Sequence, residues 1–285
     1  MRYIFFGSPR FAALILEHLI ASGIPPAHIV ANPDRPAGRK KVITSPPVKA
    51  LAEKHSIPVS QPDTLSKYRL PVSDDSFDFA VVAAYSKIIP ESLLAQFPRG
   101  AIGVHPSLLP KYRGASPIQS AVLNGETETG VSLFLMDAHV DHGPVLVQEK
   151  IAIGETETYL ELHDRLAKIS GGLLQKTLPD FLAGKLKPQE QNHAEATATK
   201  KLGAEDGYIA PELLEAAQRE GGKTARVIFN MIRALATEPG VWTMFHGKRV
   251  KLLEAELVPQ GTLMLRAIQE EGKTERNLDR GTILR

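Results

Sequence analysis

The first 183 residues alternate between short apolar runs and stretches whose apolar residues recur at helical spacing. The apolar runs predict strands at residues 2–6, 28–32, 77–85 and 100–104, and the helical spacing predicts helices at 11–22, 47–55 and 90–97. An adjoining strand pair at 129–137 and 145–153 and a long amphipathic helix at 158–182 complete this part of the chain. Because strands alternate with helices, the pattern predicts an α/β fold with a mostly parallel sheet flanked by helices.

A composition change follows, because residues 184–198 are polar and carry no apolar periodicity, which predicts a linker. Beyond it, a helix at 224–236 and strand-like pieces at 241–247, 249–258 and 261–268 predict a small β-barrel. The final stretch, 270–285, holds little strand pattern, so we expect a short barrel. The expected organisation is a first domain at 1–183, a linker at 184–200 and a smaller domain at 201–285.

Composition narrows the class of protein. The chain has 43% hydrophobic and 23% charged residues, which is ordinary for a soluble protein. No apolar run approaches the roughly 18 residues that span a bilayer, and Met1 leads directly into a strand, so we expect a cytoplasmic protein without a membrane segment. Zero cysteines exclude disulfides, thiolate catalysis and a cysteine zinc site. A net charge of +2 is too small to indicate a polyanion partner by itself.

Two common nucleotide-binding loops are missing from the sequence. The turn after the first strand, Gly7–Phe11, has one glycine and lacks the GxGxxG spacing that brings a backbone close to a pyrophosphate. The chain also lacks a GxxxxGK[ST] loop. Both absences count against a dinucleotide or nucleoside triphosphate as cofactor.

His105 stands at the carboxyl end of an apolar strand, before a proline-rich loop. Ligands of open α/β sheets bind outside the carboxyl ends of the strands, so this imidazole is placed for chemistry, and Pro106 keeps its backbone extended. A lone histidine is more often a hydrogen-bonded structural residue. Asp141, however, follows the strand at 129–137, and a His and an Asp on neighbouring strand ends can form a proton-handling pair.

A metal cluster of three histidines is conceivable, because His139 and His142 flank Asp141. No HExxH-type spacing supports such a cluster, so we predict no metal and interpret both histidines as exposed loop residues. The proton chemistry expected of His105 and Asp141 requires no metal.

The stretches Ile102–Gln119 and Met136–Leu146 resemble the formyltransferases that use 10-formyltetrahydrofolate. In that family a His-x-Ser-Leu-Leu-Pro segment precedes an Asp-x-Gly segment, as His105–Pro110 precedes Asp141–Gly143 here. Three further stretches, 33–41, 113–119 and 198–209, fit the members that formylate methionyl-tRNA. The resemblance implies a Rossmann-like catalytic domain, an oligonucleotide-fold-like C-terminal barrel, 10-formyltetrahydrofolate as co-substrate and initiator methionyl-tRNA as partner of a monomeric enzyme.

The resemblance also assigns site residues. His105 and Asp141 match the catalytic pair, with the imidazolium donating to the developing oxyanion and Asp141 supporting its charge. Ile88 and Ile89 would be apolar walls of the folate pocket, although an apolar pair after a strand is by default ordinary core. The implied folate-binding residues are Ser86, Lys87, Ile88, Ile89, Ser107, Leu108, Leu109, Pro110, Asp137 and Val140.

The chain departs from the family pattern at Gly103, where the family has a catalytic Asn that holds the formyl oxygen. Loss of one oxyanion donor typically lowers the rate roughly a hundredfold to a thousandfold. Slower catalysis, a replacement donor from Ser107 or the loop backbone, and loss of activity are all open. Two alternatives to methionyl-tRNA formylation follow: transfer to a small amine such as an amino sugar, or a catalytically weakened tRNA- or folate-binding homologue.

A basic loop at Arg35–Lys49 contains no acidic residue, and Gly38 and the prolines are expected to deny it regular structure. Such a charge run is usually a solvated loop, but its cations could also neutralise nucleic-acid phosphates. In the resembled members this insertion grips the acceptor arm of the initiator tRNA, with the arginine matched by Arg39 as its most important contact. The implied tRNA-binding residues are Arg35, Arg39, Lys40, Lys41, Lys248 and Arg249.

Overall fold

The computed structural model of the chain describes residues 1–38, 41–71, 77–279 and 282, which form two compact units. The first unit comprises Met1–Arg113, Gly130–Lys150 and His163–Ala198, and the second comprises Gly114–Thr129, Ile151–Leu162 and Thr199–Arg285. The division into domains at 1–183, 184–200 and 201–285 stays a prediction. Among the described residues, no helix is both long and apolar enough to cross a membrane.

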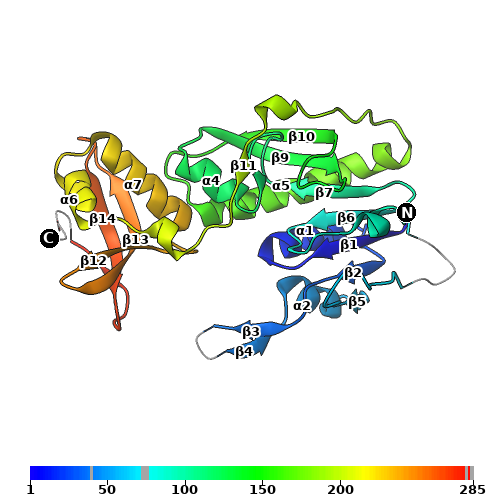
Figure 1. Cartoon of the computed structure of the whole chain (residues 1–285), viewed down its shortest axis with the longest axis horizontal. Helices are drawn as coiled ribbons and strands as arrows, with labels where there is room; N and C mark the ends of the chain where they lie inside the picture. The colour runs from blue at the N-terminus through cyan, green and yellow to red at the C-terminus, as the bar shows by residue number, and fades with distance from the viewer. Residues whose placement is uncertain (39–40, 72–76, 280–281, 283–285) are drawn as a thin grey trace. The chain divides into compact units, whose positions relative to one another are not determined.

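A seven-stranded sheet runs in the order β10-β9-β7-β6-β1-β2-β5 (Figure 1). The strands are β1 (Tyr3–Gly7), β2 (His28–Val30), β5 (Val59–Ser60), β6 (Phe79–Ala83), β7 (Ala101–His105), β9 (Glu128–Leu135) and β10 (Val145–Ala152). The pairs β2/β5, β1/β2, β1/β6 and β6/β7 are parallel, and β7/β9 is antiparallel. The predicted mostly parallel sheet is therefore confirmed.

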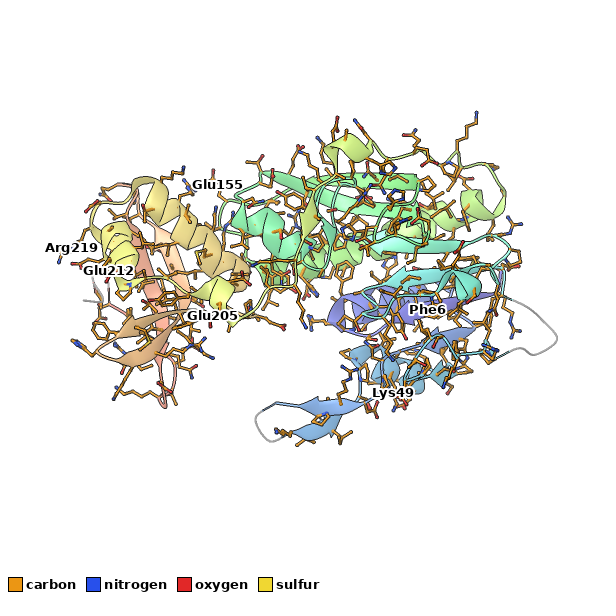
Figure 2. The ribbon with its side chains drawn as sticks, viewed as in Figure 1. Phe6, Lys49, Glu155, Glu205, Glu212 and Arg219 are labelled. Atoms are coloured by element: carbon orange, nitrogen blue, oxygen red, sulfur yellow. The ribbon has the colours of Figure 1, made fainter. Side chains whose placement is uncertain are left out.

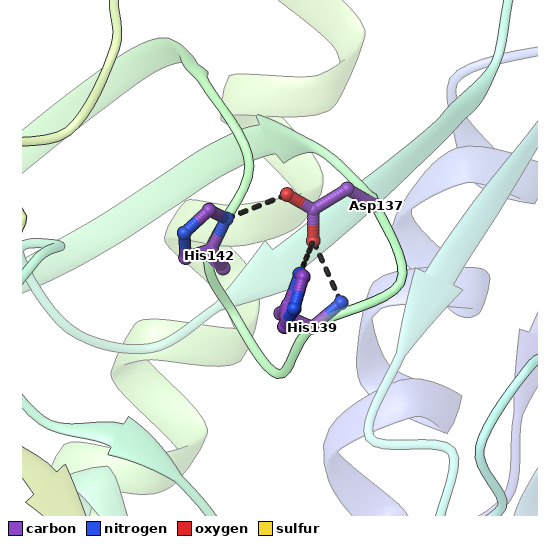
Figure 3. Close-up of side chains that lie close together, drawn as sticks. All are labelled: Asp137, His139 and His142. Atoms are coloured by element: carbon purple, nitrogen blue, oxygen red, sulfur yellow. Dashed lines mark hydrogen bonds and ion pairs between the residues drawn. The ribbon is translucent and has the colours of Figure 1, made fainter.

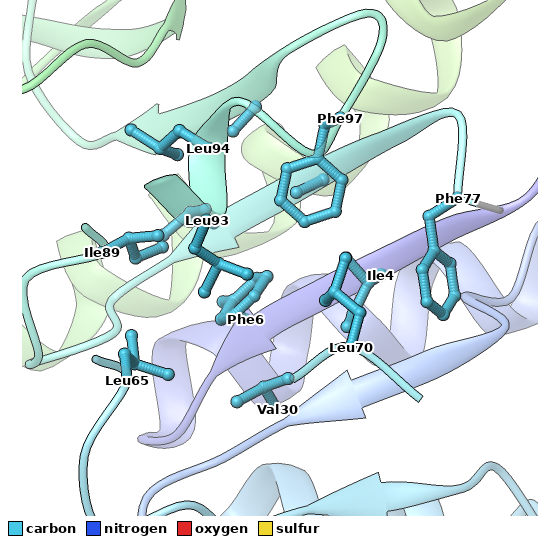
Figure 4. Close-up of a cluster of buried hydrophobic side chains, with 13 residues drawn as sticks. Ile4, Phe6, Val30, Leu65, Leu70, Phe77, Ile89, Leu93, Leu94 and Phe97 are labelled. Carbon is cyan, nitrogen blue, oxygen red and sulfur yellow. The ribbon is translucent and has the colours of Figure 1, made fainter. Parts of the chain in front are cut away.

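Alternate residues of the central strands are buried on opposite faces of the sheet, as a parallel sheet covered on both sides requires. On one face Tyr3 stacks on Phe79, which in turn meets Phe181 of α5 edge to face. On the other face, Ile4 and Phe6 lie in an apolar cluster that includes residues of α3 and of the chain before β6 (Figure 4). The helices that follow these strands are α1 (Arg10–Ala21), α2 (Pro47–Lys54), α3 (Glu91–Leu94), α4 (Pro117–Leu123) and α5 (Tyr159–Leu182).

The strand order reverses direction at β1. The chain moves from β1 to β2 and β5 on one side, then returns to β6 and β7 on the other side. In open α/β sheets the carboxyl ends of strands beside such a reversal form the ligand-binding crevice. The residues that follow β1, β6 and β7 are therefore the place to look for a site, and His105 is the last residue of β7.

The basic loop contains regular structure, so the prediction of a loop without it was wrong. Arg35–Ala37 (β3) and Val42–Thr44 (β4) form an antiparallel hairpin, with Arg35 opposite Thr44. A proline is tolerated in this isolated pair because an edge strand can leave one N–H position unpaired. Asp34 anchors its base, since the carboxylate accepts hydrogen bonds from Lys49, Gln61 and Ser45. Figure 2 labels Lys49 on α2.

The second unit is built on a four-stranded antiparallel sheet of order β12-β13-β14-β15. Its strands are β12 (Val241–Phe245), β13 (Lys248–Leu257), β14 (Leu263–Glu270) and β15 (Arg276–Asn277), accompanied by α6 (Pro211–Arg219), α7 (Gly222–Leu235) and a 3₁₀ turn, η2 (Ala204–Gly207). From α7, the buried Arg233 donates to the carbonyls of Val122, Gly154 and Glu157. These bonds satisfy a guanidinium that burial would otherwise destabilise.

One ion pair of the first unit gives a pH prediction. Arg10 on α1 donates to both carboxylate oxygens of Asp164 on α5, and this pairing lowers the pKa of Asp164 to about 2. A depressed carboxyl pKa stabilises the fold above pH 4, and that contribution is lost as the pH falls towards 2. We expect the stability difference between the parent and Arg10→Met, measured by urea unfolding, to shrink over this range. A difference that is constant from pH 6 to pH 2 would contradict the assignment.

Candidate active site

The structure brings His105 and Asp141 together, as the sequence predicted. The Nδ1 atom of His105 lies 3.4 Å from Oδ2 of Asp141, and both side chains are largely buried. The other ring nitrogen, Nε2, lies 2.8 Å from the carbonyl oxygen of Tyr112. Because a carbonyl only accepts, Nε2 carries a hydrogen, and Nδ1 is left as the ring nitrogen that can take up or release a proton.

The two residues that contact the ring of His105 both have a left-handed backbone conformation. Tyr112, which supplies the carbonyl, has φ of +59°, and Asp141 has φ of +48°. Residues with side chains adopt this conformation only at a cost of roughly 1–2 kcal/mol, so the surroundings must hold it. Gly143 shows one reason for the Asp-x-Gly spacing, because a Cβ there would lie 1.9 Å from the carbonyl oxygen of Leu135.

A residue that the sequence did not reveal holds the Asp141 turn. The side-chain amide of Gln191, 7% exposed, donates to the carbonyls of Asp141 at 3.0 Å and Gly143 at 2.7 Å. Its own oxygen accepts two hydrogen bonds from the guanidinium of Arg113. Gln191 lies in the polar stretch interpreted as a linker, where one glutamine among many polar residues carries no distinguishing signal. This stretch also contains η1 (His193–Glu195) and enters β11 (Ala198–Thr199), which pairs with β8 (Arg113–Gly114).

Gln191→Leu is expected to lower kcat for the reaction at His105 about tenfold, because two buried carbonyls lose their donor and the Asp141 turn is released. KM should change less, since Gln191 acts through Asp141. Gln189→Leu is the matched control, because its exposed side chain makes no hydrogen bond with any described residue. Equal kcat values for the two variants would show that Gln191 does not position the turn.

Gly103 is the residue opposite Phe134 in the β7/β9 pair. A Cβ at position 103 would lie 2.3 Å from Cε1 of Phe134, whose ring is buried. The phenyl ring therefore fills the space in which an asparagine side chain would begin. The change from the family's asparagine to Gly103 therefore does not leave an empty space, because the ring of Phe134 fills it.

The hydroxyl of Ser107, one of the two candidate replacement donors, already has a partner in this structure. This buried hydroxyl donates to the carbonyl of Lys111 at 2.6 Å, and a hydroxyl has one hydrogen to give. The amide of Leu109 is also engaged, by Ser132. The main-chain N–H groups of Ser107 and Leu108 remain, since neither donates to any residue in the described part of the chain.

The predicted folate residues after β6 lie at the same sheet edge as His105, because β6 and β7 are parallel. Ile88 is 82% exposed, whereas Ile89 is 5% exposed and belongs to the apolar core. Ile89 is therefore an ordinary core residue, which is the default for an apolar residue after a strand. Ser86 accepts a hydrogen bond from Asn32, and Lys87 donates to the carbonyl of Pro62.

The other predicted folate residues lie around the His105 and Asp141 loops. Leu109 is buried, and its carbonyl accepts a hydrogen bond from Gln148. Leu108 and Pro110 are half-buried beside it, and Val140 is 64% exposed on the Asp141 turn. Burial tends to raise the pKa of Asp137, but hydrogen bonds from His142 and from the His139 amide outweigh it and leave this pKa below its ordinary value.

The predicted tRNA-binding residues fall into three groups. Arg35 and Lys41 are exposed on the β3–β4 hairpin, beside exposed Val42 and Ile43. Arg39 and Lys40 lie outside the described residues. On β13 of the second unit, Lys248 is exposed, whereas the guanidinium of Arg249 lies 4.1 Å above the ring of Trp242.

Comparison with known proteins identifies the family to which the chain belongs. The sequence pattern of the family described as formyl transferase matches residues 1–178, and that of the formyl transferase C-terminal domain matches residues 222–264. The chain is 40% identical to methionyl-tRNA formyltransferase of Chloroflexus aurantiacus, over 90% of this chain and 80% of that protein. It is 39% identical to methionyl-tRNA formyltransferase of Geobacter sulfurreducens, over 88% and 77% respectively.

A solved structure supports the same fold. The N-formyltransferase of Helicobacter canadensis, crystallised with folinic acid and dTDP-3-aminofucose, superposes with a TM-score of 0.62. The alignment covers 90% of this chain and 88% of that one at 18% identity, which supports the fold alone. By the sequence matches, the chain belongs to the formyl transferase family, in the group that contains the methionyl-tRNA formyltransferases.

Proposed function

We propose that the chain transfers the formyl group of 10-formyltetrahydrofolate to the amino group of initiator methionyl-tRNA. The observation that carries the proposal is the His105–Asp141 pair at the carboxyl edge of the sheet, in a chain 40% identical to methionyl-tRNA formyltransferases. The exposed cations of the β3–β4 hairpin support a polyanionic acceptor substrate.

The reaction needs one group that moves protons and one that stabilises negative charge. The amine nitrogen attacks the formyl carbon, the carbonyl oxygen becomes an oxyanion, and the bond from that carbon to the folate nitrogen then breaks. The amine loses a proton and the departing nitrogen gains one. His105 serves both needs through Nδ1, since a protonated ring donates there to the oxyanion and later gives that proton to the leaving nitrogen.

The surroundings of His105 restrict where the substrates sit. With Nε2 held by the Tyr112 carbonyl, the reacting carbon must lie on the Nδ1 side of the ring, next to Asp141. Asp141 then lies beside the reacting groups and relays the amine proton through water. The main-chain N–H groups of Ser107 and Leu108 donate to the formyl oxygen and replace the missing asparagine amide only in part. Low exposure of both side chains strengthens each of these electrostatic interactions.

The acceptor is tested by offering the chain two amines with the same formyl donor. We expect formylmethionyl-tRNA to form efficiently, with a rate that falls steeply as salt increases. An amino-sugar nucleotide should be a poor acceptor whose use depends little on salt. Preferential formylation of the sugar would contradict the proposal and favour a small-amine transferase.

The hairpin cations give a separate prediction. Arg35→Ala and Lys41→Ala should each raise KM for methionyl-tRNA severalfold and reduce the salt slope by about one, because each removes a phosphate-directed cation. The same outcome is expected for Arg39→Ala. Lys54→Ala removes an exposed cation of α2 and is the matched control. A large loss of folate affinity in any hairpin variant would contradict a role in tRNA binding.

A further inference from the structure

Three potential metal ligands meet in the turn between β9 and β10. Asp137, His139 and His142 each offer one ligand atom, and these atoms all lie within 4.8 Å of one another (Figure 3). The sequence analysis considered a cluster of histidines here and interpreted His139 and His142 as exposed loop residues. It did not include Asp137, because the spacing D-x-H-x-x-H comes together only through the fold of the turn. No function proposed for the chain uses the two imidazoles.

The distances in the cluster are close to those of a coordination shell. Nδ1 of His142 lies 2.6 Å from Oδ2 of Asp137, and Nδ1 of His139 lies 3.9 Å from Oδ1. Ligand atoms about 2.1 Å from a tetrahedral ion stand roughly 3.4 Å apart. The closest pair, 2.6 Å apart, would therefore open by about 0.8 Å, and a pair at the 4.8 Å limit would close by about 1.4 Å. The ion would replace the proton now held between His142 and Asp137.

The backbone and neighbours hold this turn before any ion binds. The amide of His139 donates to Asp137 at 2.8 Å, which fixes the carboxylate. The ring of His142 stacks on that of His193 with centroids 4.2 Å apart and planes 7° from parallel. Arg113 in turn donates to Nδ1 of His193 at 2.9 Å, so the plane of His142 is supported from outside the turn. Such outer contacts orient metal-binding imidazoles.

We propose that Asp137, His139 and His142 bind one divalent transition-metal ion of the zinc class, with water completing its coordination. Two imidazoles and one carboxylate suit zinc and its neighbours, whereas magnesium and calcium prefer oxygen ligands alone. The side chains are 36%, 75% and 36% exposed, respectively, so an ion can enter from solvent. Because Asp141 lies between the two histidines, the ion would cross-link the turn that carries it.

The test measures metal binding without substrates, so its result does not depend on the proposed formyl transfer. The chelator-treated full chain is titrated with Zn²⁺ by calorimetry, and with Co²⁺ while visible absorption is recorded. We expect one ion per chain with a micromolar or tighter dissociation constant, and a Co²⁺ spectrum that Zn²⁺ abolishes. His139→Ala, His142→Ala and Asp137→Asn should each weaken binding at least tenfold.

His55→Ala is the matched control, because it removes an exposed histidine from the end of α2. Its affinity for Zn²⁺ should equal that of the parent. His139→Ala guards against misfolding, since this side chain is the most exposed of the three. The backbone amide that donates to Asp137 is retained in the alanine variant. Parent-like Zn²⁺ affinity in correctly folded His139→Ala, or an equal loss in His55→Ala, would overturn the site.

Discussion

Replacing His105 with alanine is expected to lower kcat for formyl transfer by about 10²–10⁴-fold, the range typical of a positioned acid–base group. Its Nδ1 is the ring nitrogen left for proton transfer, because Nε2 is held by the Tyr112 carbonyl. Steady-state kinetics with methionyl-tRNA measures the loss, which should appear in kcat more than in KM for either substrate.

A matched control separates chemistry from packing. His28 is 7% exposed, close to the 5% of His105, and also makes one side-chain hydrogen bond, to Ser60. His28→Ala should keep kcat within a few-fold of the parent value. Asp141→Asn should resemble His105→Ala in direction, since it removes the charge beside Nδ1. Parent-like kcat in folded His105→Ala would show that the pair is structural.

The second large effect is expected at Gly103. Gly103→Asn alone should destabilise the chain by about 1–3 kcal/mol, because the new Cβ collides with the buried ring of Phe134. Thermal or urea unfolding measures this loss. The single variant therefore cannot reveal whether an asparagine amide would improve catalysis.

The informative comparison pairs two variants. Phe134→Val removes the ring atoms that block position 103, and Gly103→Asn in that background adds the amide. We expect kcat to rise severalfold or more from Phe134→Val to the double variant. The upper limit is roughly a hundredfold to a thousandfold, which is the rate change typically caused by one oxyanion donor. An unchanged kcat would show that the amides of Ser107 and Leu108 already replace the asparagine fully.

The parallel sheet and the His105–Asp141 pair were predictable from sequence for separate reasons. Strands such as Phe79–Ala83 are buried on both faces and read as continuous apolar runs, which periodicity detects. Pro106 marks the end of β7, so the position of His105 followed from local chemistry. Its pairing with Asp141 was predicted from the places of both residues after neighbouring strands, and the resemblance to the formyltransferases pointed to the same pair.

Other features depend on tertiary contacts that a local pattern does not contain. The β3–β4 hairpin is anchored by Asp34, which accepts hydrogen bonds from Lys49 and Gln61. The glycine and prolines of the loop, on which the prediction was based, contain no information about these contacts. Gln191 acts by donating to the carbonyls of distant residues. The filling of the asparagine position depends on cross-strand register, because Phe134 faces Gly103 only when β7 and β9 pair as they do.

The most direct test of the central claim is single-turnover transfer from 10-formyltetrahydrofolate to initiator methionyl-tRNA with the unmodified chain in excess. Binding of the same tRNA is measured on the same preparation. We predict that the bound methionyl-tRNA becomes formylated in one exponential phase. Tight tRNA binding without formylated product would contradict the proposed function and show that the change at Gly103 has left a binding protein.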